Sequence, residues 1–346
     1  MYPVDMGFKM PPEWARHART LMEWPVKEAL WPEPFSEILP AFADIVKKIS
    51  GFEPVTLIAR PDLVQEAKIH CGPMVEILPI EHNDSWMRDN GPTFIVNSGG
   101  ELAAVNWIFN GWGGKFAAEN DNLVAPEVLK HFGVSYFDVP FIMEGGSFHV
   151  DGEGTLLTTE ECLLNENRNP RLSRTEIENI LKKYLNVSQI IWLKRGWSGD
   201  DTDGHVDNVA CFARPGSIIT QVCSDPDDPN YEISQENLSI LKQAVDAKGR
   251  RFEIIEIEQP PAAYYDDMRL TLSYLNFYFV NGGIILPVFG GQAEKTDKAA
   301  VETLGKVFPE RQIAAINGSI IARGGGNVHC LTQQMPAGLP AKSGGF

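Results

Sequence analysis

The sequence predicts an α/β protein built from repeated modules. Along its 346 residues, apolar segments of strand length alternate with amphipathic segments of helix length, roughly in the order strand, strand, helix, strand. Hairpins are mixed with helices, so the pattern differs from the regular βαβα alternation of a doubly wound sheet. Because no Pro/Ser-rich linker divides the chain, we expect a single domain over residues 1–346. The tail after about residue 336 is rich in Gly, Pro and Ala and is expected to be flexible.

An internal repeat supports this modular interpretation. The segment Gly-Gly-Ser-Phe-His-Val at 145–150 matches Gly-Gly-Asn-Val-His-Cys at 325–330 in residue type. Positions 145 and 325 lie 180 residues apart, which fits modules of roughly 60 residues or a multiple of that length. Modules arranged in a ring would bring their glycine turns together at one centre.

Hydrophobic periodicity and turn residues predict the elements in order. Residues 1–34 are expected to be an irregular lead-in, anchored by Trp14, Trp24 and Trp31. Helices are expected at 35–49, 61–69, 124–132, 173–184, 231–247 and 297–308. Strands are expected at 54–59, 75–80, 93–97, 101–109, 134–139, 147–150, 155–159, 190–193, 206–212, 217–222, 252–257, 273–280, 283–288, 311–316 and 328–333. The helix at 173–184 has a clear start, because Ser173 and Glu176 form a capping box.

The charge balance limits the range of partners. The formal net charge is −16, which argues against nucleic acid and against anionic membrane surfaces as partners. A cationic small substrate would be attracted electrostatically. The alternative is that the acidity serves solubility alone.

The cysteines argue for a reducing location. Five are scattered along the chain without a CxxC pair, which fits neither a disulfide scaffold nor a structural zinc site. The N-terminus lacks the pattern of a signal peptide, and no apolar stretch is long enough to span a membrane. We therefore expect a cytoplasmic protein.

A glycine-rich segment ending in a cysteine is the first candidate for chemistry. The glycines at 324–326 let other groups approach the backbone closely. Cys330, placed after such a turn, could lie at the floor of a cleft as a thiolate nucleophile. The competing interpretation is a buried, inert cysteine, because free cysteine is among the most buried residue types.

A histidine and an aspartate two residues apart form the second candidate. His205 and Asp207 lie on a predicted strand, so their side chains are expected to face the same way. Histidine is the usual proton shuttle, and a neighbouring carboxylate can bind a cation or orient the ring. Two alternatives remain open. One is a solvated acidic loop, and the other is a divalent-metal site that adds Asp201 and Asp203 to the pair.

Two further acidic turns could contribute. Asp89 precedes a Gly-Pro turn, and Glu144 precedes a Gly-Gly turn. Either carboxylate could bind a cation, and either could be an ordinary surface turn. His149 and His329 are expected to be packed or hydrogen-bonded, since on a strand His329 would face away from Cys330.

One cysteine, one histidine and several carboxylates suit guanidine hydrolysis without a metal or other cofactor. Carboxylates match the planar guanidinium group bidentately. The cysteine could attack the central carbon, and the histidine could protonate the departing amine.

Four segments of the chain resemble the agmatine deiminases, which are grouped with peptidylarginine deiminases, arginine deiminases and amidinotransferases. They are Trp-Met-Arg-Asp-Asn-Gly-Pro at 86–92, Glu-Gly-Gly at 144–146, Gly-His-Val-Asp-Asn at 204–208 and Gly-Gly-Gly-Asn-Val-His-Cys at 324–330. The likeness extends nearly end to end and includes segments 109–114, 227–232 and 273–278.

The resemblance implies a five-bladed α/β propeller, or pentein, of ββαβ modules with pseudo-fivefold symmetry. It implies that Cys330 becomes an amidino-cysteine and that His205 acts as general acid and then base. Asp89 and Asp207 would hold the guanidinium, with Glu144 assisting.

The resemblance also implies that Trp86 and Trp112 line the channel. The sequence leaves open which residues bind the distal amine, with Asp84, Asp201 and Asp203 as candidates.

The implied reaction converts agmatine and water to N-carbamoylputrescine and ammonia in polyamine (putrescine) biosynthesis. A homodimer is left open. The alternatives are a peptidylarginine or arginine deiminase of the same fold, a metal-dependent hydrolase and a non-catalytic polyamine-binding protein. A peptide enzyme would need an open groove, whereas an agmatine enzyme needs a closed, acidic far end.

Overall fold

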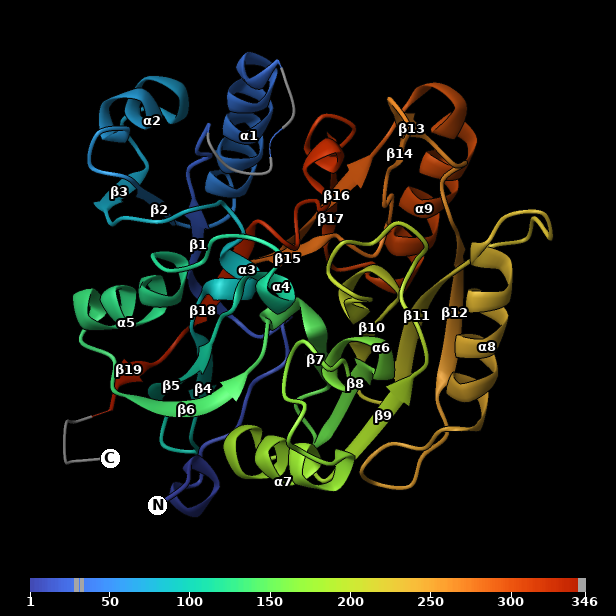
Figure 1. The fold of residues 1–346 in the computed structure, drawn as a ribbon, viewed down its shortest axis with the longest axis horizontal. Helices are drawn as coiled ribbons and strands as arrows, with labels where there is room; N and C mark the ends of the chain where they lie inside the picture. Colours follow the sequence, from blue (N-terminus) through green and yellow to red (C-terminus); the bar gives the residue numbers. More distant parts are fainter. Residues whose placement is uncertain (28–30, 32–33, 342–346) are drawn as a thin grey trace.

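The computed structural model describes residues 1–27, 31 and 34–341 and has a mixed α/β fold (Figure 1). Its sheets share one plan, in which an antiparallel pair of strands is followed by a helix and by a third strand parallel to the second. Five modules follow this plan within the described residues. The predicted strand, strand, helix, strand repeat is therefore confirmed.

The first module joins the two ends of the chain. Its sheet runs in the order β18 (Thr332–Pro336), β1 (His17–Glu23), β2 (Val55–Ala59) and β3 (Glu76–Pro79). Strand β1 is antiparallel to β18 and parallel to β2. The connecting helices are α1 (Phe35–Ser50) and α2 (Val64–Cys71).

The other four modules are continuous in sequence. The second contains β4 (Thr93–Val96), β5 (Glu101–Ile108), α5 (Asp121–Phe132) and β6 (Tyr136–Ile142). The third contains β7 (Phe148–Val150), β8 (Thr155–Thr159), α7 (Arg174–Leu185) and β9 (Gln189–Leu193). The fourth contains β10 (Ala210–Arg214), β11 (Ser217–Val222), α8 (Asn230–Gln243) and β12 (Glu253–Glu258). The fifth contains β15 (Tyr278–Val280), β16 (Gly283–Val288), α9 (Glu294–Val307) and β17 (Gln312–Asn317).

Short elements complete the chain. A small hairpin consists of β13 (Tyr264–Tyr265) and β14 (Met268–Arg269). The helical turns are η1 (Pro3–Met6), α3 (Met87–Asn90), α4 (Gly111–Gly114), η2 (Gly145–Ser147), α6 (Glu160–Leu163), η3 (Val206–Asn208), η4 (Gly291–Ala293) and η5 (Ile321–Gly324). No helix in the described part of the chain combines the length and apolar character needed to cross a membrane.

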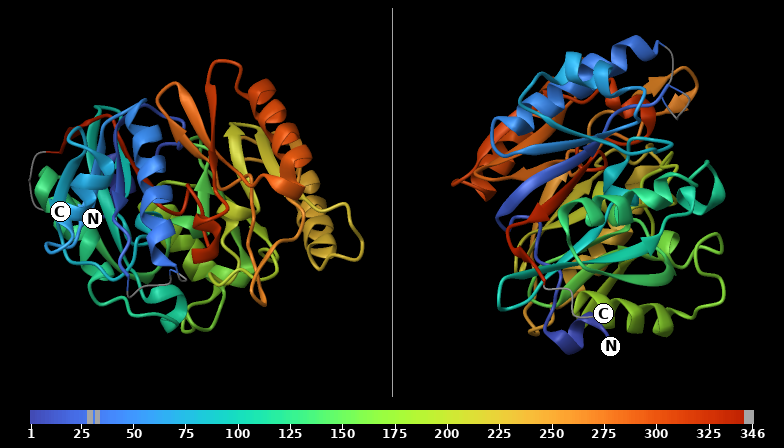
Figure 2. Two further views of the ribbon diagram at one scale, coloured as in Figure 1. Left: turned by 90° about the horizontal axis from the view of Figure 1, so that it is seen from above. Right: turned by 90° about the vertical axis from the view of Figure 1, so that its left-hand side faces the viewer.

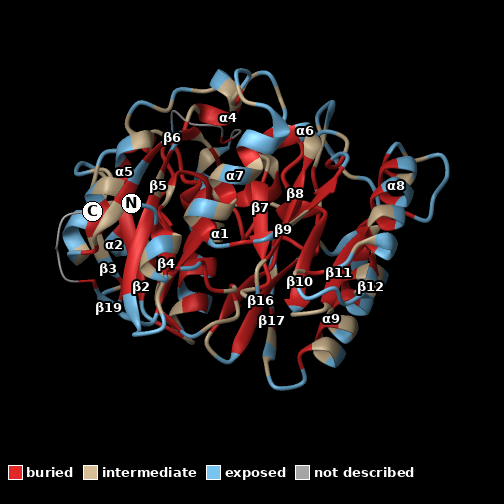
Figure 3. Ribbon diagram, turned by 90° about the horizontal axis from the view of Figure 1, so that it is seen from below, coloured by how far each residue is buried: buried red, intermediate tan, exposed pale blue. Residues whose placement is uncertain are grey.

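The strands form the interior and the helices cover them. Strands β2 and β8 are buried at every residue. Helices α1, α8 and α9 lie at the periphery (Figure 2), with one buried and one exposed face each (Figure 3). In α1 the buried face carries Ile38, Phe42 and Ile45 at helical spacing, so apolar burial fixes the helix on its sheet.

The turn before the first strand of each module carries polar residues, and several of these turns contact one another. They are α3 before β4, η2 before β7, η3 before β10, residues 273–277 before β15 and residues 325–331 before β18. Turn η2 contacts both α3 and η3, although these turns belong to three separate modules. The two matching glycine segments, 145–150 and 325–330, both stand at this position, so the internal repeat reflects the modular fold.

Several sequence predictions require correction at these turns. The strands expected from 206, 273 and 328 begin only at Ala210, Tyr278 and Thr332. Polar side chains before these starts bond to one another across separate turns, since Asn276 donates to Asn208 and His329 contacts Asp207. His205 and Asp207 therefore lie at a 3-10 turn, and Cys330 lies before its strand.

Both chain ends are more ordered than expected. The lead-in contains β1, which lies inside the first sheet because β18 supplies its second partner from the far end of the chain. Trp24 and Trp31 are buried as expected, and Trp14 packs edge-on against Phe279. In the C-terminal tail, β19 (Leu339–Pro340) pairs with β5, whereas residues 342–346 lie outside the described residues.

Candidate active site

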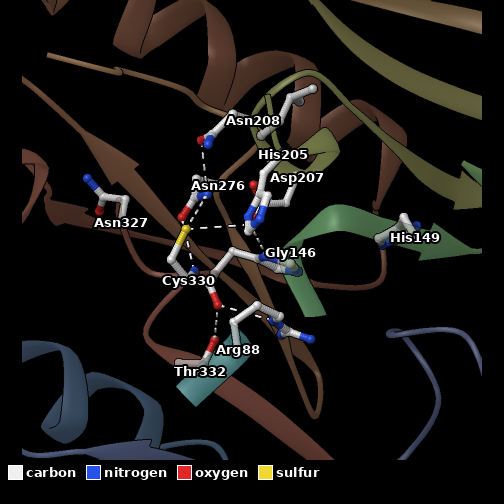
Figure 4. A network of polar contacts seen from close by, with 12 residues as sticks. Arg88, Gly146, His149, His205, Asp207, Asn208, Asn276, Asn327, Cys330 and Thr332 are labelled. Atoms are coloured by element: carbon white, nitrogen blue, oxygen red, sulfur yellow. Dashed lines mark hydrogen bonds and ion pairs between the residues drawn. The ribbon is translucent and has the colours of Figure 1, made fainter. Parts of the chain in front are cut away.

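Cys330 lies at the centre of a buried polar network (Figure 4). Its sulfur accepts a hydrogen bond from Asn276 Nδ2 at 3.1 Å and lies 3.4 Å from Asp207 Oδ2. The backbone is fixed as well, since Arg88 N donates to Cys330 O at 3.1 Å. Burial, with the nearby charges of Asp207 and Asp89, raises the pKa of the Cys330 thiol well above its usual value. The thiol is therefore neutral until positive charge enters the site.

The glycine turn before Cys330 is needed for close approach, as the sequence predicted. A Cβ on Gly326 would lie 2.6 Å from the Trp86 ring and 3.0 Å from the Cys330 sulfur. A larger residue would have to displace one of these two groups.

Asp207 is held from behind by His329. The Nδ1 atom of His329 lies 2.9 Å from Asp207 Oδ2, and its Nε2 atom lies 2.9 Å from Glu13 Oε1. Burial alone would raise the pKa of Asp207, but the hydrogen bond and charge of His329 outweigh burial and lower it. The two carboxylates in turn raise the pKa of His329 above its usual value, against burial and Arg88. His329 is hydrogen-bonded, as expected, and it contacts the site through Asp207.

His205 lies beside both Asp207 and Asp89. Its Nδ1 atom lies 3.7 Å from Asp89 Oδ1. A Cβ on Gly146 would lie within 2.9 Å of His205 Nδ1, Asp207 Oδ2 and Asp89 Oδ1, so these three atoms crowd around one glycine. Burial lowers the pKa of His205 to about 3, despite the opposing charge of Asp207. The ring is therefore neutral in the free protein.

Asp89 is a strongly perturbed carboxylate beside the Trp112 and Gly146 turns. It accepts hydrogen bonds from Trp112 Nε1 and from Gly146 N, both at 2.9 Å. Burial, together with the charges of Asp207 and Glu144, raises its pKa to about 8. A cation placed beside Asp89 would favour the ionised form.

Glu144 is paired with a buried arginine that the sequence analysis did not single out. Arg168 Nε donates to Glu144 Oε1 at 2.6 Å, and Arg168 Nη1 donates to Asp203 Oδ2 at 2.8 Å. Lys115 also binds Asp203, at 2.6 Å. Burial raises the pKa of Glu144, and Arg168 opposes that shift. Because two cations already engage Asp203, the proposed metal cluster at Asp201, Asp203, His205 and Asp207 is disfavoured.

A cavity of about 290 Å³ opens onto the Cys330 sulfur. Its lining includes five sequence-predicted residues, namely Trp86, Asp89, Trp112, Asp201 and Cys330. The lining is completed by Phe116, Thr202, Met268, Arg323 and the glycines at 324–326. Trp86 stacks on Trp31 with ring centroids 5.2 Å apart, which makes one wall rigid.

Asp84 does not belong to this cavity. Its backbone N donates to Asp121 Oδ1, and its own carboxylate accepts from Ser85 N at 2.7 Å. The role of Asp84 at the distal amine stays a prediction, because its side chain lies outside the lining of this cavity.

Three buried residues of the network were missed from the sequence. They are Glu13, Arg168 and Asn276. Asn276 stands in the segment 273–278, which was noted for its resemblance but was interpreted only as a strand. Glu13 and Arg168 carried no local signal, because their partners lie far away in the sequence.

Comparison with known proteins places the chain. The family model described as Porphyromonas-type peptidyl-arginine deiminase matches residues 9–336. The agmatine deiminase of Stutzerimonas stutzeri (strain A1501) is 42% identical over 360 residues, which covers 97% of this chain and 97% of that protein. The solved agmatine deiminase of Enterococcus faecalis superposes with a TM-score of 0.93 at 35% identity, covering 97% of this chain and 98% of that one. The agmatine deiminase of C. jejuni with substrate bound superposes with a TM-score of 0.89 at 35% identity, covering 96% of this chain and 97% of that one.

These full-length similarities agree with the resemblance carried by the glycine, histidine and cysteine segments. The match over residues 9–336 shows that the chain belongs to the Porphyromonas-type peptidyl-arginine deiminase family.

Proposed function

We propose that this protein is an agmatine deiminase, which converts agmatine and water to N-carbamoylputrescine and ammonia. One observation carries the proposal: the cavity that opens onto the Cys330 sulfur is also lined by the Asp89 carboxylate, with Asp207 3.4 Å from the sulfur. Two carboxylates beside one thiol suit a flat, positively charged carbon centre.

The substrate itself activates the nucleophile in this proposal. The guanidinium binds between Asp89 and Asp207, and its charge favours both the ionised Asp89 and the Cys330 thiolate. The proton lost by the thiol passes to His205, which is neutral in the free protein. Cys330 Sγ then forms a bond to the guanidinium carbon, which the two carboxylates hold close to the sulfur.

The first half-reaction ends with loss of ammonia. The bond between the carbon and its terminal nitrogen breaks, and His205 returns the proton to that nitrogen as general acid. An alkylated thiouronium remains on Cys330. His205, neutral again, removes a proton from water, whose oxygen attacks the same carbon. The C–S bond breaks as His205 returns its proton to the sulfur, and the hydroxyl proton of the addition intermediate passes to solvent, where it converts ammonia to ammonium. N-carbamoylputrescine is released and the Cys330 thiol is restored.

The far end of the cavity supports agmatine over an arginine within a peptide. Asp201 lines the cavity and can pair with the distal ammonium of agmatine. Arg323 also lines it, but its charge is partnered by Glu37 at 2.9 Å and by the Tyr265 ring. Met268, on the β13–β14 hairpin, narrows the space that a peptide backbone would need.

The wider setting follows from the same proposal. We infer that the five modules form one domain, a five-bladed propeller with pseudo-fivefold symmetry and the site at its centre. We also expect a role in putrescine synthesis and a reducing cytoplasmic location, because all five cysteines are unpaired.

The test is ammonia release from agmatine, compared with a peptidyl-arginine substrate and with free arginine. We expect kcat/KM for agmatine to exceed both, because Asp201 can pair with a distal ammonium that has no carboxylate or peptide backbone beside it. A higher kcat/KM for the peptide would instead indicate a peptidyl-arginine deiminase.

A further inference from the structure

A second cluster of metal-ligating side chains lies beside the reacting groups. Glu144, Cys162 and His205 each offer one ligand atom, and these atoms lie within 4.8 Å of one another. All three residues are fully buried. Glu144 precedes η2, Cys162 lies in α6, and His205 caps η3, so separate segments converge on this point.

The cluster contains polar atoms that lack a hydrogen-bond partner among the described residues. They are Glu144 Oε2 and both ring nitrogens of His205. A buried polar atom left unpaired costs about 1–3 kcal/mol, which a bound ligand could offset. A guanidinium could engage the carboxylate and the imidazole, but it would gain nothing from the Cys162 sulfur. The thiol is the feature that the hydrolytic reaction leaves unused.

We propose that Glu144, Cys162 and His205 form an inhibitory binding site for a zinc-class divalent cation. Thiolate sulfur, imidazole nitrogen and carboxylate oxygen are the donor types that zinc prefers, and three protein ligands leave a fourth position for water. Bond lengths of about 2.0–2.3 Å require the ligand atoms to close by roughly 1 Å from their present spacing.

The charges around the cluster suit such an ion. His205 is already neutral, so only the Cys162 thiol must lose a proton when the metal binds. Burial and the Glu144 charge raise the pKa of Cys162, and the metal must displace that proton. The neighbouring cation Arg168 is paired with both Glu144 and Asp203, which reduces its repulsion of the metal.

The consequence for catalysis rests on the proposed function. A metal bound to His205 would remove the group that carries the proton in both half-reactions. The ion is therefore an inhibitor and has no part in turnover. Metal binding itself does not depend on which guanidine is the substrate, so it can be measured without any activity.

The binding test uses Cys330→Ala, which removes the competing thiol of the reaction site. We expect cobalt to give a thiolate-to-metal charge-transfer band in this variant and zinc to abolish the band by displacement. The double variant Cys330→Ala/Cys162→Ala should lose the band, whereas Cys330→Ala/Cys71→Ala should keep it, because Cys71 lies on the outer helix α2. X-ray absorption of the zinc-loaded single variant should show one sulfur ligand. A cobalt band that persists in Cys330→Ala/Cys162→Ala would overturn the proposal. X-ray absorption that shows no sulfur ligand on zinc in Cys330→Ala would also overturn it, and this second measurement does not depend on the folding of a double variant.

The activity test uses the Cys162→Ala variant alone. Its agmatine turnover without zinc should match that of the wild type, and it should need at least tenfold more zinc for half-inhibition. Equal inhibition of both proteins would mean that zinc acts elsewhere. If agmatine is not turned over at all while the cobalt band depends on Cys162, the proposed function fails and the metal site stands.

Discussion

One carboxylate oxygen of Asp207, Oδ2, lies 2.9 Å from His329 Nδ1 and 3.4 Å from the Cys330 sulfur. His329 and Cys330 are neighbours in the chain, yet the histidine ring meets the reaction site through this aspartate. Behind it, Glu13 holds the other ring nitrogen. Asp207, the proposed guanidinium-binding carboxylate, is therefore positioned by a buried chain of contacts that starts at Glu13 in the N-terminal lead-in.

Replacing His329 with glutamine should lower kcat/KM for agmatine by about tenfold to a hundredfold. The reason is the loss of a charge-assisted hydrogen bond, which is worth about 1.5–3 kcal/mol. The acid limb of the pH–rate profile should also move to higher pH. His329 lowers the pKa of Asp207, so without it this carboxylate takes up a proton at a higher pH and becomes inactive there. An acid limb that stays in place would show that His329 does not tune Asp207.

Agmatine binding should release protons near neutral pH through Asp89. Its pKa is about 8 in the free protein, so it is mostly protonated at pH 7, and the guanidinium requires the ionised form. Calorimetry of Cys330→Ala in buffers of different ionisation enthalpy should detect close to one proton released at pH 7. Binding should tighten as the pH rises toward 8. With Asp89→Asn added, binding should weaken and this release should vanish. A release that persists would assign the proton to another group.

Adding one methyl group at residue 326 should impair catalysis more than stability. In Gly326→Ala the new Cβ would meet the Trp86 ring and the Cys330 sulfur, so the thiol or the cavity wall must move. We expect kcat/KM to fall at least tenfold, because small displacements of reacting groups are costly. The matched control is Gly305→Ala in helix α9, where a Cβ meets open space. That variant should keep full activity and gain about 0.5–1 kcal/mol in the free energy of unfolding.

Removal of metal ions should not reduce activity. The proposed reaction uses only the thiol, the imidazole and the carboxylates. In the acidic loop at 201–207, Asp203 is engaged by Lys115 and Arg168. Exhaustive dialysis against a chelator should therefore leave kcat for agmatine unchanged, or raise it if zinc was bound. Activity lost on chelation and restored by added metal would favour the metal-dependent alternative.

Elements with a local cause could be predicted from the sequence. The capping box of Ser173 and Glu176 is present at the start of α7, because both groups lie within one turn. Likewise, Phe35–Ser50 forms the expected helix from its own apolar face. The glycine turn before Cys330 was also recognisable, since close packing there depends on residue type alone.

Features set by distant partners could not be predicted in this way. Strand β1 exists because β18 and β2 flank it, and the buried pair of Arg168 and Glu144 joins separate segments. The segment around His205 has the apolar alternation of a strand, yet it forms a turn in which Asp207 and Asn208 bond to distant residues, His329 and Asn276. Asp84 shows the converse, because this carboxylate stands near the Trp86 motif but accepts a hydrogen bond from Ser85 N and does not line the cavity.

The most direct test of the central claim is mass spectrometry of protein quenched in acid during agmatine turnover. We expect a covalent alkylated amidino adduct on the peptide that contains Cys330, absent from Cys330→Ala, which should fold normally and release no ammonia. The control Cys71→Ala should give the same adduct and the same rate as the wild type. Ammonia release by Cys330→Ala at a rate near that of the wild type would contradict the account.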